Sequence, residues 1–581
     1  MAVFNKLNLT MKLKIDFRSI YKPKLLDLCK KGGYDRKTFA SDVIAGIIVG
    51  IIALPLAIAF GIASGVTPQQ GLITAIVAGF IISFFGGTRF LIGGPTGAFI
   101  VIVAGIISQY GMTGLTIATM MAGFFLIIMG ITKVGVIFKF IPYPIVVGFT
   151  SGIALTIFTT QMKDFFGFTM DVPSGFIPSW ICYFKNIASI NWVETAMSAA
   201  CLLIIIGWNK VTKKIPGSLI ALIAGTAISI CLDKFAGVQL ATIGTKFPEL
   251  AGGMTLPKPE MPQITFDTVR NLVSPAFTIA VLCAIESLLA AMVTDGVTGR
   301  HHHANSELIG EGIANMICPL FGGIPATGAI ARTMANINNG GKTPVAGIVH
   351  AAVLLLIYLF LMPYAVYIPL SCLAAILVMV AYGMSEWRTF KYLLKGDRAD
   401  VAVLLITFFL TVIIDLTVAI EVGVVLAIFL FVRRVMQTSE VQAIEGSTLA
   451  AAEDDEIVNP EDTQWLDIPK GVEVYEINGP FFFGLASKFE EFDSKRSNGT
   501  KVRILRMRHV PFMDSTGVKN LRNLIDRAQK RGIQTILSGV NKHVRDELEK
   551  FGVDKELGQE YILPHITPAL AKAREVLEKK Q

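Results

Sequence analysis

The chain has 581 residues, of which 53% are hydrophobic and 17% are charged, and its mean hydropathy is +0.59. These values exclude an ordinary soluble protein and predict a polytopic α-helical membrane protein. The net charge of +8 does not indicate a nucleic-acid partner, because basic residues beyond the N-terminal segment are scattered or interleaved with acidic ones. The seven cysteines show no pair at metal-ligand spacing, so we predict small interior residues and neither a metal site nor a cofactor.

Residues 1–38 form a basic segment that we predict to be cytoplasmic. The first 40 residues hold ten Lys or Arg against three Asp, and they lack the short apolar stretch and cleavage site of a signal peptide. By the positive-inside rule, this end faces the cytoplasm. The basic "FVRR" (Phe431 to Arg434) after the last apolar run predicts the same side for the other end of the membrane region, and hence an even number of spans.

Residues 39–435 are predicted to be the transmembrane domain, with about fourteen apolar segments, of which two are too short to span a bilayer. Clear examples are Val43–Ala63, Leu219–Leu232, Ala276–Val293 and Thr417–Val432. The polar loop Gly244–Gln263 divides the region into two halves of about seven segments each.

A short motif occurs once in each half, at the head of the third segment. The first copy is "GGPTGAF" (Gly93 to Phe99) and the second is "GGIPATGAIAR" (Gly322 to Arg332). Both copies interrupt an apolar run, a pattern typical of inverted-repeat transporters, whose broken helices meet near the bilayer midplane. Because Gly and Pro are common in membrane helices and the match is short, helix packing alone is the alternative interpretation.

The motif predicts an anion site. If Pro95 and Ala326 open two half-helices that face each other, free N–H groups and two positive dipole ends converge on one cavity. The residues concerned are Thr96, Gly97 and Ala98 in the first copy and Thr327, Gly328 and Ala329 in the second. The two glycines allow close approach of an anion, and the threonine hydroxyls either donate to it or only cap the half-helices.

Two charged residues lie within these apolar segments. Arg332 is predicted to face a cavity and to attract the anion, unless it snorkels to the cytoplasmic surface. For Glu286, desolvation favours the protonated form of the carboxyl group, whereas the nearby cation Arg332 favours the ionised form. These opposing effects make Glu286 the candidate for taking up a proton during transport, unless it is a structural acid held by Arg332. Its neighbour Ser287 is interpreted as a helix-packing residue in preference to a donor in the site.

The remaining polar groups carry less weight. We expect His350, Glu311, Asp415 and Glu421 at membrane interfaces, because each occurs near a predicted helix end or among polar neighbours. The run "RHHHAN" (Arg300 to Asn305) is predicted to be a solvated loop, because its adjacent histidines lack metal-ligand spacing. No motif of a catalytic nucleophile, phosphate loop or carboxylate pair occurs, so the protein is not predicted to be an enzyme.

Beyond the membrane region the composition becomes acidic and then globular. We predict a linker over residues 436–470, which contains the acidic run Ala451–Asp467. A small α/β domain follows at 471–581, where strand-like runs alternate with amphipathic helical stretches. The predicted strands are Val472–Ile477, Lys501–Met507 and Ile533–Gly539.

Several motifs in register resemble the sulfate permease family of anion transporters. They are "IIALPLAIAFGIASGVTPQQGL" (Ile51 to Leu72), "GGPTGAF", "AIESLLAAMVTDGVTG" (Ala284 to Gly299), "ANSELIGEGIAN" (Ala304 to Asn315) and "GGIPATGAIART" (Gly322 to Thr333). The run "MDSTGVKNL" (Met513 to Leu521) resembles the signature of the STAS domain that members carry. The resemblance extends from about Thr38 to the end of the chain.

The resemblance implies fourteen segments in two inverted seven-segment repeats, divided into core and gate domains, followed by a cytoplasmic α/β STAS domain. It also implies a homodimer in the bacterial inner membrane that works by an elevator-like movement. The site it implies consists of both motif copies, the acid Glu286 and first-span residues around Ala57 to Phe60. This agrees with the site predicted from the backbone argument.

Two departures from sodium-dependent bicarbonate members concern the coupling ion. Those members resemble this chain, but they have Asp at the position of Glu286 and Thr at the position of Ala290, four residues later. They also lack an arginine at the position of Arg332. The resemblance therefore favours proton-linked members, among which sulfate and C4-dicarboxylate carriers occur. Anion exchange, a channel-like pathway and a membrane sensor with a STAS output remain the alternatives. Ser515 resembles a serine that is phosphorylated in stand-alone STAS proteins, although it is equally typical of a helix cap.

Overall fold

The computed structural model describes residues 21–29, 34–135, 142–173, 175–211, 216–248, 257–414, 418–419, 422–423, 425–426, 428–430, 440–444, 468–481 and 499–579. The chain divides into two compact units, Met1–Ala427 and Ile428–Gln581.

The N-terminal unit is almost entirely helical. Its helices and short strands are η2 (Lys24–Cys29), α2 (Arg36–Ala63), α3 (Pro68–Phe85), β1 (Gly93–Gly94), α4 (Phe99–Ile131), α5 (Tyr143–Phe166), α6 (Phe176–Lys185), η4 (Ile187–Ser189), α7 (Trp192–Val211), α8 (Gly217–Cys231), η5 (Leu232–Ala236), α9 (Ile243–Lys246), α10 (Phe266–Thr298), α11 (Ala304–Ile317), η7 (Cys318–Phe321), β2 (Thr327–Gly328), α12 (Ile330–Asn338), α13 (Val345–Phe360), η8 (Met362–Tyr367), α14 (Leu370–Met384), α15 (Trp387–Leu393) and α16 (Arg398–Ile413). Within the described residues, seven helices are long and apolar enough to cross a membrane.

The long helix α4 is two segments in one. At Gly111 the backbone has φ 68° and ψ −173°, a left-handed conformation that glycine adopts without strain. The first part of α4 is therefore a short third segment, as predicted, and the second part is the fourth. In the second half, the short third segment is α12, which has 9 residues. The last predicted segment, Thr417–Val432, is described only in part.

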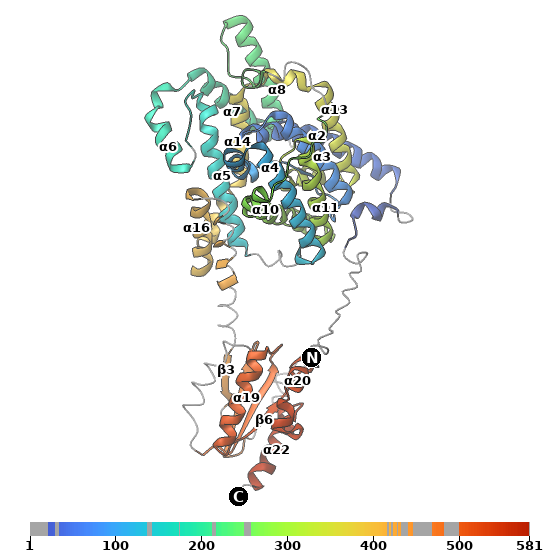
Figure 1. The fold of residues 1–581 in the computed structure, drawn as a ribbon, viewed down its shortest axis with the longest axis vertical. Helices are drawn as coiled ribbons and strands as arrows, with labels where there is room; N and C mark the ends of the chain where they lie inside the picture. The colour runs from blue at the N-terminus through green and yellow to red at the C-terminus, as the bar shows by residue number, and fades with distance from the viewer. Residues whose placement is uncertain are drawn as a thin grey trace. The chain divides into compact units, whose positions relative to one another are not determined.

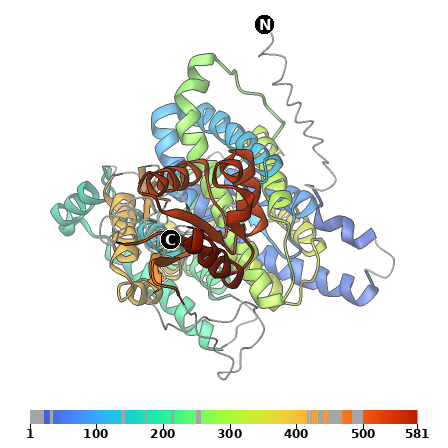
Figure 2. The ribbon, with the colours of Figure 1, turned by 90° about the horizontal axis from the view of Figure 1, so that it is seen from below.

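The helices of this unit form two groups. One group contains α2, α3, α4 and α10 to α13, and the other contains α5, α7, α8, α14 and α16, with few contacts between the groups. Figures 1 and 2 show the first group as the blue and yellow-green helices and the second as the teal and orange ones. Within the first group α2 approaches α13 closely, because a Cβ at Gly46 would lie 2.7 Å from the Cβ of Val349. These two groups match the core and gate domains of the predicted fold.

The C-terminal unit is an α/β sandwich. Its elements are β3 (Glu440–Ile444), β4 (Val472–Asn478), β5 (Val502–His509), α19 (Ser515–Lys530), β6 (Gln534–Ser538), α20 (Lys542–Lys550), α21 (Val553–Leu557), η10 (Gln559–Tyr561), β7 (Ile562–Leu563) and α22 (Ile566–Lys579). The strand order is β3-β4-β5-β6-β7, with β3 antiparallel and the others parallel. Apolar residues of α19 to α21 cover one face of the sheet, and those of α22 cover the other.

One strand of this sheet was not predicted. The edge strand β3 lies inside the segment 436–470 that was expected to be only a linker. Its pairing with β4 runs from Glu440, opposite Asn478, to Ile444, opposite Val474. A five-residue edge strand far from its partner in the chain has too little local pattern to be recognised from sequence.

Candidate functional site

The two copies of the interrupted motif lie against each other in the core group. Strands β1 and β2 pair antiparallel, with Gly93 opposite Gly328 and Gly94 opposite Thr327. The ladder continues where Ala329 N donates to the Ile92 carbonyl at 3.0 Å. The structure therefore brings together two elements that are far apart in sequence.

The first copy presents backbone donors at a helix start. The first hydrogen bonds of α4 run from Phe99 N to the Thr96 carbonyl at 3.3 Å and from Ile100 N to the Gly97 carbonyl at 3.2 Å. Among the described residues, the N–H groups of Thr96, Gly97 and Ala98 have no acceptor. Three free donors at the positive end of a helix favour an anion, and anion binding at these residues stays a prediction.

The second copy differs from the prediction of free N–H groups. Gly328 N donates to Ser287 Oγ at 2.8 Å, and Ala329 N is used by the strand ladder. The Thr327 hydroxyl donates to the Cys283 carbonyl at 3.1 Å and contacts Ser287 Oγ at 2.8 Å, and Thr327 is fully buried. The second copy therefore holds the site in shape, while the first copy offers the donors.

Arg332 ties the two copies together. Its side chain is 2% exposed, and its Nη1 donates to the Gly93 carbonyl at 3.3 Å while its Nη2 donates to the Pro95 carbonyl. The alternative of a snorkelling arginine is therefore wrong. The guanidinium lies at the first copy and adds positive charge beside its free donors.

Glu286 lies at the same break. Its Oε2 accepts a hydrogen bond from the Thr96 hydroxyl at 2.9 Å. The N-cap of α4 is Ala98, which has no side-chain capping bond. Glu286 is attracted by the charge of Arg332, but the hydrogen bonds of that guanidinium go to backbone carbonyls. The carboxyl is partly exposed, whereas Ile285 and Ser287 on either side are buried. The Glu286 carboxyl group and the free N–H donors thus meet at Thr96.

The residue that sequence reasoning underrated is Ser287. Besides Gly328 and Thr327, its hydroxyl contacts Glu311 Oε1 at 2.8 Å, so it is a hydrogen-bonding centre and not a packing residue. Glu311 and His350 are both 0% exposed, which makes their expected interfacial placement wrong. The other two residues of that expectation, at positions 415 and 421, lie outside the described residues.

Asn315 completes the second copy. Its Nδ2 donates to the Ala326 carbonyl at 2.8 Å, and its Oδ1 accepts from Ala326 N at 2.9 Å. An irregular backbone at membrane depth needs such partners inside the protein. Glu307, Glu311 and Asn315 recur at every fourth residue and therefore lie on one face of α11, and this spacing is the sequence signal that would have found them.

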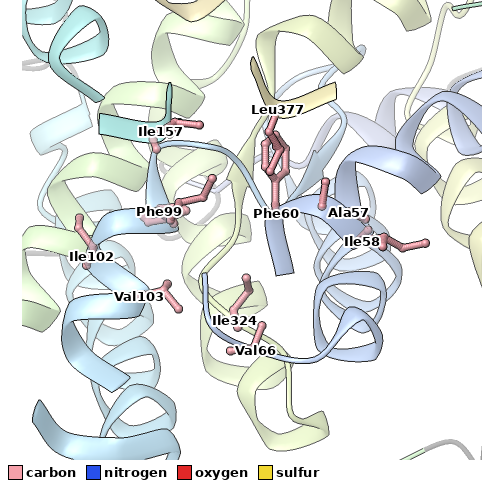
Figure 3. Close-up of a cluster of buried hydrophobic side chains, with 14 of the residues drawn as sticks. Ala57, Ile58, Phe60, Val66, Phe99, Ile102, Val103, Ile157, Ile324 and Leu377 are labelled. Carbon is pink, nitrogen blue, oxygen red and sulfur yellow. The ribbon is translucent and has the colours of Figure 1, made fainter. Parts of the chain in front are cut away.

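Apolar side chains from both helix groups cover the first copy. A Cβ at Gly97 would lie 3.0 Å from Met384 Sδ, 3.2 Å from Ile157 Cδ1 and 3.5 Å from Phe60 Cε1. Ala57 and Phe60 of α2 are 1% and 5% exposed and share one cluster with Ile157 of α5. Figure 3 shows Phe60, Ala57 and Ile157 within this cluster. The predicted first-span residues thus line the cover of the site.

Two sequence expectations concern other regions. The loop before α11 was expected to be solvated, and Arg300, His301 and His303 are exposed. The His302 side chain differs, because it is 3% exposed and its Nδ1 lies 2.7 Å from Asp295 Oδ2. Ser515 is the first residue of α19 and is exposed, while the Asp514 carboxylate accepts from Gly517 N at 2.6 Å. Asp514 therefore caps the helix, and a role for Ser515 in regulation stays a prediction.

Comparisons with known proteins agree with this arrangement. The family model described as Sulfate permease family matches residues 39–407, and the STAS domain model matches residues 466–573. The chain is 39% identical over 538 residues to the putative sulfate transporter YvdB of Bacillus subtilis, covering 92% of this chain and 97% of the relative. It is 31% identical over 499 residues to the bicarbonate transporter BicA of Synechocystis, covering 83% and 85%.

Two solved structures share the fold. The murine Slc26a9 anion transporter in the inward-facing state has a TM-score of 0.81 at 20% identity, covering 99% of this chain and 98% of that chain. The transmembrane domain of a cyanobacterium bicarbonate transporter BicA has a TM-score of 0.58 at 30% identity, covering 68% and 98%.

Proposed function

Since the chain belongs to the sulfate permease family and is a multi-pass membrane transporter of anions, we propose that it carries a small oxyanion or C4-dicarboxylate together with a proton. The membrane is the inner membrane of a bacterium, with the basic N-terminal segment and the STAS domain on the cytoplasmic side. The protein works as a homodimer in which the core group moves against the gate group in an elevator-like way.

One observation carries the proposal: the anion donors and a carboxyl group meet at one residue. The free N–H groups of Thr96, Gly97 and Ala98 would receive the anion, while the Thr96 hydroxyl donates to Glu286. An ionised Glu286 repels an anion at these donors, and a protonated one does not. Binding of the anion and binding of the proton therefore favour each other, which is the requirement for symport.

The alternative substrate is bicarbonate, because the relative BicA carries that name. In that reading a sodium ion would replace the proton. Sodium needs oxygen ligands, and the Ala290 side chain supplies none. A proton on Glu286 therefore remains the favoured coupling ion for this chain.

The test is uptake into proteoliposomes of radiolabelled sulfate, bicarbonate, fumarate or succinate under an inward proton gradient. We expect uphill accumulation of one of these anions by the wild type and its loss in Glu286→Gln. Asp267→Asn is the matched control, because Asp267 is an exposed acid in the first turn of the same helix. Accumulation that persists in Glu286→Gln refutes the coupling role, and flux without accumulation in the wild type points to a channel or exchanger.

Removal of the chain from Glu440 onward separates a carrier from a sensor. A carrier should keep part of its anion flux, since the donors and Glu286 all lie in the membrane unit. A sensor would lose its output with the STAS domain.

A further inference from the structure

Two buried carboxyl groups beside the site take no part in the proposed coupling step. Glu307 and Glu311 lie one turn apart on α11, and both are 0% exposed. Within the described residues, neither oxygen of Glu307 and only one oxygen of Glu311 has a hydrogen-bond partner. A buried carboxylate with few donors and no cation is costly, so burial favours the protonated form of both groups.

The charges near the site lead to the same conclusion. Arg332 contributes one positive charge beside Glu286, and the charges of Glu286 and Glu307 act in turn on Glu311. With all three acids ionised, the sum is negative before any anion arrives, and the anion is repelled. With all three protonated, the sum is positive, and the anion is attracted. Each acid that ionises therefore opposes anion binding.

Glu311 is connected to the broken segment through Ser287. Ser287 Oγ lies 2.8 Å from Glu311 Oε1 and also accepts from Gly328 N. An ionised Glu311 accepts the Ser287 proton across this contact, whereas a Glu311 protonated on Oε1 donates to Ser287 Oγ. The Ser287 proton is then free to go to Thr327 Oγ1, and the Thr327 proton goes to the Cys283 carbonyl. Every hydroxyl in this chain then donates once.

Loss of the Glu311 proton reverses part of the chain. The carboxylate can only accept, so the single proton of Ser287 turns to it. The contact between Ser287 and Thr327 then survives only if Thr327 withdraws its proton from the Cys283 carbonyl. The protonation state of Glu311 thus decides whether the Thr327 hydroxyl donates to the Cys283 carbonyl or to Ser287 Oγ, both of which belong to α10.

We propose that Glu311 is a second proton-binding group of the transport cycle and that, through Ser287, it positions the Thr327–Gly328 break for anion binding. This inference rests on the proposed symport and extends it. Glu286 acts at the donors themselves, whereas Glu311 acts on the opposite copy of the motif.

Glu307 lies one turn closer than Glu311 to the cytoplasmic end of α11. Its carboxylate faces the Thr88 hydroxyl and the Gly87 and Thr88 amides, none of which bonds it with hydrogen-bond geometry. The N-terminal segment covers this end of the helix, where Lys22 N donates to Ser306 Oγ at 2.8 Å. Glu307 therefore lies between Glu311 and the end of α11 that this segment covers.

The other titratable groups around these acids are few. Cys283 and Glu286 face Glu311 from α10, and Tyr21 of the N-terminal segment faces Glu307. The remaining helices packed against α11 are α3 and α4, which carry no charged side chain. Two histidines precede α11: Glu307 N donates to the His303 carbonyl, and His302 lies against Asp295. A change in pH therefore acts on this part of the protein through these histidines as well as through the acids of α10 and α11.

The experiment measures how many protons move with each anion. In proteoliposomes, the pH gradient at which net uptake of the transported anion reverses gives this ratio for the wild type, Glu286→Gln, Glu311→Gln and the control Asp267→Asn. Glutamine at 311 keeps an N–H donor for Ser287, as the protonated acid does. We expect Glu311→Gln to remain a proton-driven transporter that moves one proton fewer per anion than the wild type.

An unchanged ratio in Glu311→Gln overturns the inference while leaving the symport through Glu286 intact. Loss of proton-driven uptake in the wild type instead defeats the proposed function itself, so the two failures are distinguishable. If Glu311→Gln does not fold, Ser287→Ala keeps both acids and removes the hydroxyl that connects Glu311 to Gly328 and Thr327. We then expect the affinity for the anion to change less steeply with pH, by about tenfold less per pH unit on the alkaline side. A pH dependence identical to that of the wild type would contradict the inference.

Discussion

Replacing Gly97 by alanine tests whether the free N–H groups of the first motif copy bind the anion. The added methyl group would lie 3.0 Å from Met384 Sδ, 3.2 Å from Ile157 Cδ1 and 3.5 Å from Phe60 Cε1. It would occupy the narrow space between these covering side chains and the donors. Gly97 has no left-handed backbone conformation, so alanine is compatible with its φ angle.

The effect on stability should be small. Overpacking costs about 1–3 kcal/mol, and the contacts here are the ends of flexible side chains, which favours the lower value of about 1 kcal/mol. The lower entropy of the unfolded chain offsets about 0.4–1 kcal/mol of this cost. The effect on binding should be larger, because each lost hydrogen bond to a charged ligand costs about 1.5–3 kcal/mol. One lost bond corresponds to an affinity roughly 10- to 150-fold weaker.

The assay combines thermal unfolding in detergent with titration of the transported anion. We expect Gly97→Ala to unfold within a few degrees of the wild type and to bind the anion at least about tenfold more weakly. Gly105→Ala is the control, because Gly105 lies in the same part of α4 and a Cβ there meets nothing within 4 Å. A folded Gly97→Ala protein with wild-type affinity would refute the placement of the anion.

Three further predictions concern stability. Asn315→Ala leaves Ala326 N buried without an acceptor and the Ala326 carbonyl with only the Cys283 thiol, so it should destabilise the membrane unit by about 1–3 kcal/mol in thermal unfolding. The exposed Asn186→Ala should change little. Gly46→Ala should lower the free energy of unfolding by about 1–3 kcal/mol, because the added methyl group forces α2 away from α13. Gly207→Ala is the control, since a Cβ there meets nothing within 4 Å, and equal unfolding temperatures of the two variants would contradict this prediction. Hydrogen bonds from two lysines of α22 lower the pKa of Glu575 to about 2. Its contribution to stability is therefore present above its unfolded pKa and is lost only as the pH falls towards 2, so a carboxyl NMR titration should show no midpoint near the ordinary value of about 4.3.

The membrane class, the interrupted third segments and the C-terminal α/β unit follow from the sequence because their signals are local. Apolar runs, turn-forming residues and strand alternation are properties of neighbouring residues, and they do not depend on what packs against them. The strands predicted around residues 472, 501 and 533 correspond to β4, β5 and β6. The residues that form the break, such as Thr96 and Gly328, were recognised in the same way, from two copies of one motif.

Only the tertiary structure decided which of these residues offer free donors. The N–H groups of Gly328 and Ala329 are used by Ser287 and by the strand ladder, so the two copies of the motif have different tasks. Glu311 is connected to the site through its contact with Ser287, 24 positions away in the sequence. Hydropathy shows that a polar group is out of place in an apolar helix, but its hydrogen-bond partner comes from a distant segment. The physical reason is that an irregular backbone in a membrane must be satisfied by whatever the fold brings next to it.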